Sequence, residues 1–386
     1  MRNFNLNKFL EAMLGVSDRV SDLNFSVGKP PQVEIDGQLR AVKPAGLQRL
    51  TPFQTEQIAM HLMQGNRDVI NALINTGSTD CSYAIPGKNR FRVNIFQQRG
   101  TYAIVLRVIN TEIPTVEQLG LPAEINNVAD LMNGVVLVTG PTGSGKSTTL
   151  AAIIDRINRE KAYHIVTIED PVEYMHLHKK STVNQREIGS DTKSFSLALR
   201  AALRQAPKVI LIGEMRDVET IEIALEAAET GHLVLSTLHT IDAAKTIDRI
   251  IGVFPKDQEP QIRTRLAQSF RYIISQRLVP KVGGGRLAVL EILKSSMRTR
   301  EYVNKGETEG KSLVDAMRDG SSDGMQEFDG VLETMVGQGV ITPQTALSYA
   351  TNRNNLALRL RDLARSEQPT VSDVIELASD RNLVEI

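Results

Sequence analysis

The feature that most constrains this chain is a glycine-rich segment between an apolar run and a helix-forming run. Val135–Val138 precede the segment, and the alanine-rich Leu150–Ile157 follow it. The segment consists of Gly140, Pro141, Thr142, Gly143, Ser144, Gly145, Lys146, Ser147 and Thr148. A strand, a GxxxxGK[ST] loop and a helix in this order are typical of a P-loop, whereas a glycine turn that merely precedes a helix needs no such pattern.

A P-loop binds a nucleoside triphosphate, because its glycines let backbone N–H groups and a helix N-terminus point at the phosphates. We therefore expect Lys146 to reach the β- and γ-phosphates. We expect the hydroxyl of Ser147 to bind Mg²⁺.

The length of the chain indicates how many domains it contains, and its charge indicates which partners it can bind. A chain of 386 residues exceeds one ordinary domain, so about two or three domains are expected. Its 45 basic and 45 acidic residues cancel, and aromatic residues make up only 4% of the chain. Nucleic-acid binding relies on basic surfaces and stacking aromatics, so we expect no nucleic-acid partner.

Cys81 is the only cysteine, which excludes an intramolecular disulfide and every multi-cysteine metal site. We expect it to be a small, half-buried apolar residue. No apolar run approaches the roughly 18 residues of a membrane span, and the N-terminus lacks a signal-peptide core. The chain is therefore expected to be cytoplasmic and to meet a membrane only through partners.

The first 109 residues have the pattern of a small α+β domain with an antiparallel sheet. Alternating segments predict strands, and Asp36-Gly37 predicts a hairpin turn. The expected strands are 23–27, 32–35, 91–97 and 102–108, and the expected helices are 8–16, 55–63 and 67–75. Residues 110–122 contain Pro114 and Pro122 and have no sustained period, so they are expected to form an interdomain linker.

From Gly134 onward, strands alternate with helices, which predicts a mostly parallel sheet covered on both faces. The expected strands are 135–139, 164–168, 209–212 and 233–237, followed by a hairpin of 278–282 and 287–293 around Gly283–Gly285. The fold class is therefore α/β, with a nucleotide-binding core over residues 123–293. Residues 294–386 are expected to form a helical C-terminal region and tail, with helices such as 324–336, 343–349 and 356–364.

Acidic residues follow two strands of the predicted sheet. Glu169, Asp170 and Glu173 follow one strand, and Glu214 follows another. Ligands of such sheets lie beyond the carboxyl ends of the strands, so these carboxylates are candidates for orienting water or binding Mg²⁺. An acidic loop that caps the next helix is the alternative. Gly213 occupies a position where an aspartate is common.

A histidine stands at each end of a further strand, His232 before it and His239 after it. Either imidazole could sense the γ-phosphate and relay its loss to a neighbour. A structural histidine is the alternative for both positions.

These segments together resemble the secretion-type hexameric ATPases, and specifically the PilT/PilU family of type IV pilus retraction ATPases. The four matching segments are GPTGSGKSTTLAA, TIEDPVEYMH, ILIGEMRD and TGHLVLSTLHT. The N-terminal SDLNFSVGKPPQVEIDGQLR and RFRVNIFQQRG match as well, as do AAKTIDRIIGVFP and ISQRLVPK. The resemblance covers most of residues 5–350.

The resemblance implies a PAS-like N-terminal domain, a RecA-like ATPase domain and ATP with Mg²⁺ at the junction of N- and C-terminal domains in a homohexameric ring. It implies phosphate and Mg²⁺ binding by Lys146 and Ser147, water activation by Glu173 and Mg²⁺ binding by Glu214. It also implies that His232 and His239 form a histidine box, and that Gly213 is normal in this family. Arg92 and Arg107 are our candidates for the arginines that complete the site.

The implied activity is ATP hydrolysis that powers pilus retraction and twitching motility, with an inner-membrane pilus platform protein as partner. One departure concerns the helical AIRNLIRE motif of the PilT branch. The corresponding Met297–Lys305 retains only Arg300 and the apolar spacing. This divergence favours the PilU branch and an accessory motor that works beside a paralogous retraction ATPase.

There are three alternatives to this interpretation. A nucleic-acid motor on the same RecA-like core is disfavoured by the zero net charge and the few aromatic residues. A pilus-assembly or type II secretion ATPase usually carries a four-cysteine metal subdomain, and a single cysteine argues against it. A nucleotide-regulated scaffold would organise a partner ATPase without its own turnover, and the intact Glu173 and Glu214 argue against that.

Overall fold

The computed structural model describes residues 4–43, 48–86, 88–109 and 112–366. Its contacts define two compact units. The first unit comprises residues 1–118, 122–137 and 147–238, and the second comprises 119–121, 138–146 and 239–386. Within the described ranges, no helix has both the length and the apolar character needed to cross a membrane.

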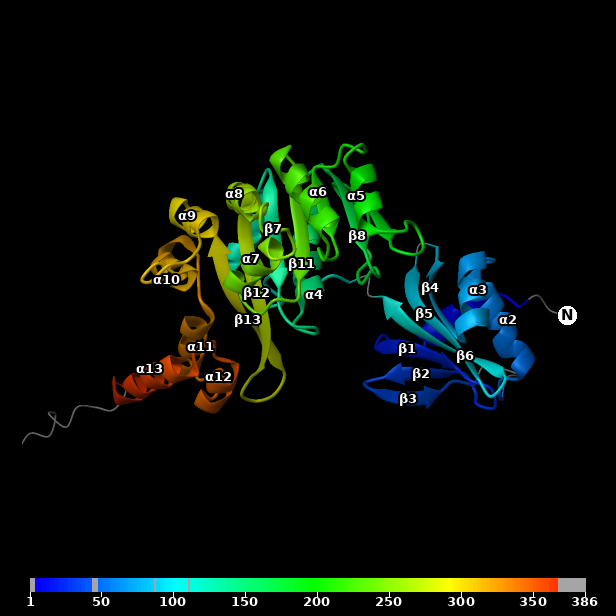
Figure 1. The fold of residues 1–386 in the computed structure, drawn as a ribbon. Coiled ribbons are helices and arrows are strands. Elements are labelled where there is room, and N and C mark those ends of the chain that lie inside the picture. Colours follow the sequence, from blue (N-terminus) through cyan, green and yellow to red (C-terminus); the bar gives the residue numbers. More distant parts are fainter. Residues whose placement is uncertain (1–3, 44–47, 87, 110–111, 367–386) are drawn as a thin grey trace, which may run out of the picture. The chain divides into compact units, whose positions relative to one another are not determined.

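The first sheet has six strands in the order β3-β2-β1-β6-β5-β4, and its neighbouring strands are antiparallel (Figure 1). The strands are β1 (Val20–Phe25), β2 (Gln32–Ile35), β3 (Gln38–Ala41), β4 (Ser78–Ile85), β5 (Asn89–Gln98) and β6 (Thr101–Ile109). Asp36 and Gly37 join β2 to β3 with φ angles of 54° and 78°. Positive φ at both turn residues is the geometry of a two-residue hairpin, as the sequence predicted.

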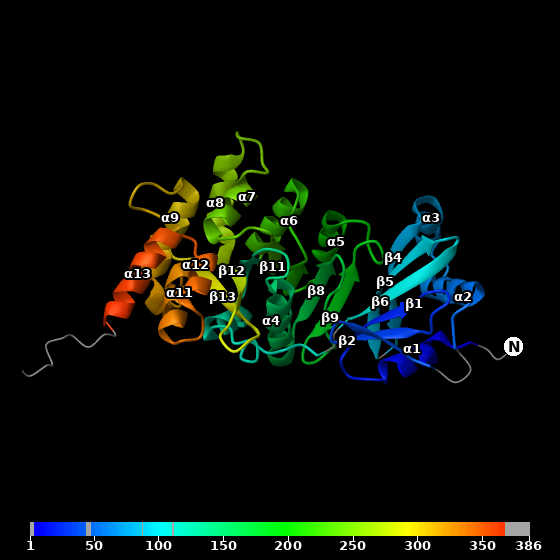
Figure 2. The ribbon, with the colours of Figure 1, turned by 90° about the horizontal axis from the view of Figure 1, so that it is seen from below.

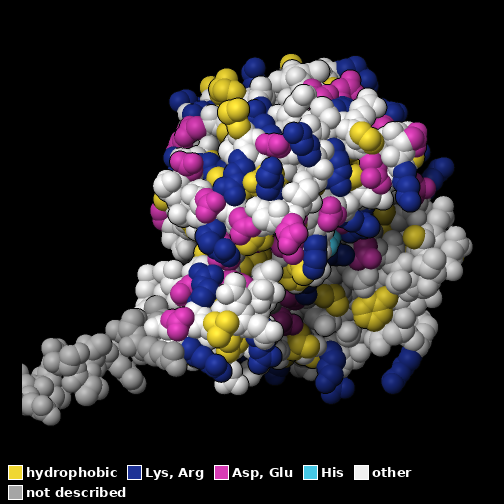
Figure 3. All heavy atoms as spheres, turned by 60° about the vertical axis from the view of Figure 1, so that its left-hand side comes forward, with side chains coloured by type: hydrophobic (Ala, Val, Ile, Leu, Met, Phe, Trp, Pro, Cys, Tyr) yellow, Lys and Arg dark blue, Asp and Glu magenta, His cyan; other side chains and the backbone are white. Residues whose placement is uncertain are grey.

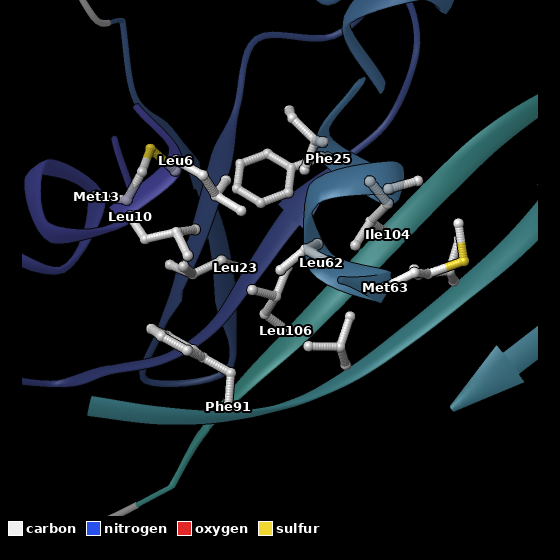
Figure 4. Packing of buried hydrophobic residues seen from close by; sticks show 14 of the residues in the cluster. Leu6, Leu10, Met13, Leu23, Phe25, Leu62, Met63, Phe91, Ile104 and Leu106 are labelled. Atoms are coloured by element: carbon white, nitrogen blue, oxygen red, sulfur yellow. The ribbon is translucent and has the colours of Figure 1, made fainter. Parts of the chain in front are cut away.

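Three helices accompany this sheet: α1 (Leu6–Leu14), α2 (Pro52–Met63) and α3 (Arg67–Thr76). Thr51 and Gln54 form a capping box at the start of α2, which explains why that helix begins at Pro52. Figure 4 shows side chains of α1 and α2 packed on those of the sheet, including Leu10, Phe25 and Leu62. Full burial of each such side chain stabilises the fold by about 1.5–3 kcal/mol.

Cys81 lies half-buried on β4 and packs against this core, as expected. Burial raises the pKa of its thiol to about 11, with Asp80 and Glu187 adding to the effect. The thiol is therefore protonated and unreactive near neutral pH.

The second sheet has seven strands in the order β13-β12-β7-β11-β10-β8-β9. They are β7 (Gly134–Thr139), β8 (His164–Glu169), β9 (Thr182–Glu187), β10 (Val209–Ile212), β11 (Leu233–Leu238), β12 (Phe270–Pro280) and β13 (Arg286–Lys294). Strands β8 to β11 pair in parallel, and β12 and β13 form an antiparallel hairpin. Every residue of β10 and β11 is buried, which explains the continuous apolar sequence of β10 and the largely apolar sequence of β11.

Helices connect these strands (Figure 1). They are α4 (Lys146–Glu160), α5 (Phe195–Ala202), α6 (Val218–Glu229), α7 (Ala243–Ile251) and α8 (Glu259–Ser269), with the 3-10 helix η1 (Ala123–Asp130) ahead of β7. Helices α5 and α6 pack against β8, β10 and β11. Helix α7 packs against β12 and β13.

The C-terminal region is helical, as predicted, and Figure 2 shows its last helices gathered beside the β12–β13 hairpin. Its elements are α9 (Met297–Lys305), α10 (Leu313–Asp319), the 3-10 helix η2 (Ser321–Asp323), α11 (Phe328–Gly337), α12 (Pro343–Tyr349) and α13 (Arg353–Ser366). Residues 367–386 of the predicted tail lie outside the described residues. The face shown in Figure 3 intersperses basic and acidic side chains, as the balanced composition suggests.

Arg277 of β12 ties the C-terminal helices to the sheet. Its guanidinium carbon lies 3.6 Å from the ring centroid of Phe328 on α11. Its side chain also donates hydrogen bonds to Tyr349 O and, at 3.0 Å, to Thr351 Oγ1. A cation over an aromatic ring and two hydrogen bonds together fix these helices to β12.

The structure differs from the sequence-based expectations at several boundaries. Strands β3, β4 and β9 were not predicted. Strand β12 begins at Phe270 rather than at Leu278, and α11 begins at Phe328 rather than at Gly324. Glu327 explains the later start of α11, because its side chain caps the helix by accepting a hydrogen bond from Asp329 N.

Candidate active site

The glycine-rich loop follows β7 and leads into α4. Gly140, Gly143 and Gly145 have φ angles of 146°, 78° and 91°, which side chains rarely tolerate. A Cβ on Gly140 would lie 2.4 Å from Gln276 O, and one on Gly145 would lie 2.8 Å from Gln276 Nε2. Backbone geometry therefore requires glycine at both positions, and close packing against the backbone of β12 adds to this requirement at Gly140.

Lys146 is buried within the loop, with 7% of its surface exposed. Its ammonium donates hydrogen bonds to the carbonyl oxygens of Gly140 at 2.9 Å and Pro141 at 3.1 Å. The loop is therefore wrapped around the lysine that the sequence predicted to bind phosphate.

The remaining loop residues offer polar groups for an anionic ligand. Ser144 Oγ is buried and has no hydrogen-bond partner among the described residues. Pro141, Thr142 and Gly143 are exposed, and Ser147 and Thr148 on the first turn of α4 are half-buried. A cradle of glycines, a buried ammonium and an orphan hydroxyl at a helix N-terminus fits a polyphosphate.

The carboxylates after β8 have different surroundings. Glu169 accepts hydrogen bonds from Thr167 Oγ1 at 2.7 Å and Gln185 Nε2 at 3.1 Å. Burial raises the pKa of its carboxyl group. Asp170 and Glu173, by contrast, are exposed. Among these carboxylates, Glu169 is engaged inside the fold, and Asp170 and Glu173 are accessible to solvent.

Tyr174, next to Glu173, shares a hydrogen bond of 2.9 Å with Thr148 Oγ1 of α4. This contact joins the acidic segment, residues 169–176, to the first turn of α4, the helix that follows the phosphate loop. The acidic segment and the start of α4 therefore meet here, although Thr148 and Tyr174 are 26 positions apart.

Glu187, at the end of β9, also holds the acidic segment and was missed by the sequence analysis. It is buried, and its carboxylate accepts a hydrogen bond from Val172 N at 3.1 Å. The same carboxylate binds Arg90 Nη2 of β5 at 3.1 Å and the hydroxyl of Ser82 on β4. The alternation of β9 could have revealed it, since an acidic side chain at an inward position needs a partner.

Glu214 follows β10, with 17% of its side chain exposed, and its Oε2 lies 2.5 Å from Arg216 Nη2. Gly213, before it, donates a hydrogen bond to Ile168 O at 2.7 Å. A Cβ on Gly213 would lie 3.3 Å from Glu169 Cα and 3.3 Å from Ile168 O. This crowding leaves little room for the aspartate that is common at this position elsewhere.

The two histidines have different environments. His232 Nδ1 lies 2.9 Å from Ala227 O and 3.3 Å from Thr230 Oγ1, at the end of α6. His239 follows β11 and is exposed. His232 therefore has a local structural contact, whereas His239 is accessible to solvent at the carboxyl end of its strand.

Arg92 and Arg107 lie on the six-stranded sheet, on β5 and β6. Arg92 is exposed, and Arg107 Nε lies 2.9 Å from Asp22 Oδ1. Among the described residues, no group of three His, Cys, Asp or Glu side chains forms a metal site. The hydroxyl of Ser147 and the carboxylate of Glu214 are nevertheless oxygen donors of the kind that Mg²⁺ prefers, so they fit the predicted ion.

Several known proteins are similar to this chain in sequence and in fold. A family described as "Type II/IV secretion system protein" matches residues 35–284. The type IV pilus retraction ATPase PilT of Pseudomonas aeruginosa is 44% identical over 335 residues, which are 86% of this chain and 94% of PilT. The type IV pilus ATPase PilU of the same organism is 40% identical over 361 residues, 92% of each chain.

A crystal structure of the pilus retraction motor PilT with bound ADP has a TM-score of 0.80 and 43% sequence identity. The match covers 92% of this chain and all of that one. The predicted fold class is thus confirmed: an antiparallel N-terminal sheet, a mixed ATPase sheet and C-terminal helices. The chain belongs to the type II/IV secretion system protein family and, within it, to the PilT/PilU type IV pilus retraction ATPases.

Proposed function

We propose that this chain is the subunit of a cytoplasmic, homohexameric ATPase that powers type IV pilus retraction and twitching motility. The observation that supports ATP binding best is Lys146, buried within the loop on the carbonyl oxygens of Gly140 and Pro141. A buried ammonium among backbone carbonyls is poised to exchange those partners for phosphate oxygens.

Residues 140–148 would hold the phosphates, with Ser147 and Glu214 binding Mg²⁺. When bound, Mg²⁺ would neutralise phosphate charge. Lys146 would neutralise charge that develops on the γ-phosphate.

Glu173 would orient the attacking water and accept its proton. Its exposure supports this role, because a carboxylate must reach water to act as a base. Glu169 is unsuited to that task, since its carboxylate is engaged by Thr167 and Gln185. His239 is the better candidate of the two histidines for sensing the γ-phosphate, because it is exposed at the carboxyl end of β11, where ligands of such sheets lie.

Arg92 and Arg107 would complete the site from the N-terminal domain of a neighbouring subunit. We propose four parts: an N-terminal domain (1–109), a linker (110–122), an ATPase core (123–293) and a C-terminal helical region with a tail (294–386). This division is supported by the first sheet, which ends at Ile109, and the second, which ends at Lys294.

The partners would be an inner-membrane pilus platform protein and, for an accessory motor, a paralogous retraction ATPase. The diverged sequence of α9 supports the PilU branch. A deletion strain distinguishes retraction from assembly: excess surface pili with lost twitching support retraction, and absent pili contradict it.

The biochemical test combines hydrolysis with subunit mixing. Purified full-length chain should release phosphate from ATP, and Lys146→Ala should abolish that release while the ring still assembles. Lys146→Ala and Arg92→Ala subunits, each inactive alone, should regain activity when they are mixed, because some interfaces then have an intact half from each variant. Wild-type chain without ATPase activity, or mixtures that stay inactive, would contradict the proposal.

A further inference from the structure

Gln276 of β12 contacts the phosphate loop, although the sequence analysis assigned it no role in the site. Its side-chain amide donates a 2.7 Å hydrogen bond from Nε2 to Ser144 O, and only 3% of the residue is exposed. Its neighbour Ser275 accepts a 3.0 Å hydrogen bond from Thr139 Oγ1, just ahead of the loop. Two successive residues of β12 therefore hold the loop and the end of β7.

The bond to Ser144 O determines how the loop presents its donors. A trans peptide is planar, and its C=O and N–H groups point in opposite directions. When Gln276 holds Ser144 O, the Gly145 N–H must point away from Gln276. Lys146 holds the other side of the loop through Gly140 O and Pro141 O. The direction of the Gly145 N–H is therefore fixed before any phosphate binds.

Packing alone does not account for an amide at this position. Gln276 lies in a strand with the buried Ile273, Ile274 and Val279, where an apolar side chain would fill space at lower cost. A buried amide is expected where a specific group requires a hydrogen bond. The loop carbonyl is such a group.

We propose that Gln276 is a positioning residue for phosphate binding, which keeps the Gly145 N–H directed at the polyphosphate. This inference rests on the proposed ATP binding. Gln276 does not touch the reacting atoms in this role. It preorganises the loop, so its loss weakens nucleotide affinity more than it slows turnover at saturating nucleotide.

The test uses the full-length chain with Gln276→Met, which keeps the size of the side chain and removes its hydrogen bond. Affinity for a fluorescent ADP analogue should fall about fivefold to tenfold, as for the loss of one well-formed hydrogen bond. Amide hydrogen exchange of peptides spanning residues 140–147 should accelerate without nucleotide. The KM for ATP should rise more than kcat falls.

Gln326 provides a matched control, because its Nε2 also donates a 2.7 Å hydrogen bond to a backbone carbonyl, that of Leu290 on β13. Gln326→Met should leave ADP affinity and loop exchange within twofold of wild type. If Gln276→Met does not fold, Gln276→Asn decides, since it keeps a neutral amide but is one methylene too short to reach Ser144 O.

Wild-type affinity and unchanged loop exchange in a folded Gln276 variant would overturn the inference. Equal losses in the Gln276 and Gln326 variants would also overturn it, because they would indicate general destabilisation. A wild-type chain that binds no nucleotide would instead contradict the proposed function, and exchange of the loop would still report whether Gln276 holds it.

Discussion

Arg92 and Arg107 are directly opposite each other on the antiparallel strands β5 and β6. Opposed residues of neighbouring strands share a face of the sheet, and like charges in that arrangement destabilise it. Asp22, opposite Arg107 on β1, forms an ion pair with Arg107. Among the described residues, an ion pair compensates Arg107 but not Arg92. Such a pair of arginines is suited to an anionic ligand, such as the phosphates of the proposed intersubunit site.

The first prediction concerns this pair. Arg92→Ala should lower kcat for ATP hydrolysis by about 100-fold or more, because it removes charge stabilisation from the transition state. It should leave the melting temperature unchanged or slightly higher, since the repulsion disappears. Steady-state phosphate release and thermal unfolding measure the two effects. Arg40→Ala, on the exposed strand β3, is the control and should change neither.

The second prediction concerns Glu173. Glu173→Gln should retain ADP binding and ring assembly but lose ATP turnover by at least about 100-fold, because the amide cannot accept the proton of the attacking water. Phosphate release, equilibrium binding and mass in solution measure the three properties. Glu160→Gln, which removes another exposed carboxylate, should be fully active. A Glu173→Gln chain with wild-type turnover would exclude this role.

The third prediction follows from His176, which is buried in the acidic segment. Burial lowers the pKa of its imidazole from 6.5 to about 4. Between these values the unfolded chain binds a proton that the folded chain does not, so stability should fall as pH falls from about 6.5 to about 4. The full loss is about 3 kcal/mol. As the pH falls from 7 to 4, the melting temperature of His176→Leu should rise relative to that of the exposed control His61→Gln, which keeps the buried histidine.

The fourth prediction concerns Glu291, for which the change in stability with pH has the opposite sign. Burial raises the pKa of Glu291 from 4.5 to about 7, although its carboxylate accepts a hydrogen bond from Ala243 N at 2.8 Å. Here the folded chain holds a proton that the unfolded chain has released, so stability should fall as pH rises from about 4.5 to about 7. The loss is again about 3 kcal/mol. Glu291→Gln should remove it.

Because the two groups act over nearly the same range with opposite signs, their effects should largely cancel in the wild-type chain. Glu291→Gln alone should therefore become more sensitive to acid than wild type. Equal pH profiles of the unfolding midpoint for wild type and Glu291→Gln would contradict the assignment.

The sequence was most informative where burial is complete. The interior strand β10 is a continuous apolar run, β11 is apolar apart from Ser236 and Thr237, and both were predicted. The three strands that were missed, β3, β4 and β9, all lie at sheet edges. An edge strand has one unpaired side and more exposed residues, so its sequence lacks a sustained apolar pattern. Every residue of β3, for example, is exposed.

The residues of the candidate site can be separated in a similar way, into those that a contiguous motif contains and those that only the fold brings together. Residues 140–148 and the carboxylates after β8 and β10 belong to contiguous motifs, so the sequence identified them. Glu187 contacts Arg90 across 97 positions, and Gln276 contacts Ser144 across 132. Such contacts are created by the fold, and the local pattern contains only a weak sign of them: a polar residue at a buried strand position. The crowding that explains Gly213 is equally invisible before β8 and β10 are aligned.

The two adjacent residues Gln276 and Arg277 of β12 connect the phosphate loop to the C-terminal helices. Successive side chains of a strand point to opposite faces. Gln276 therefore contacts the phosphate loop on one side, and the adjacent Arg277 contacts Phe328, Tyr349 and Thr351 of the C-terminal helices on the other. A rotation of β12 about its own axis would displace the loop and the helices together. Strand β12 therefore provides a direct mechanical connection between the phosphate loop and the C-terminal helices, through two adjacent side chains.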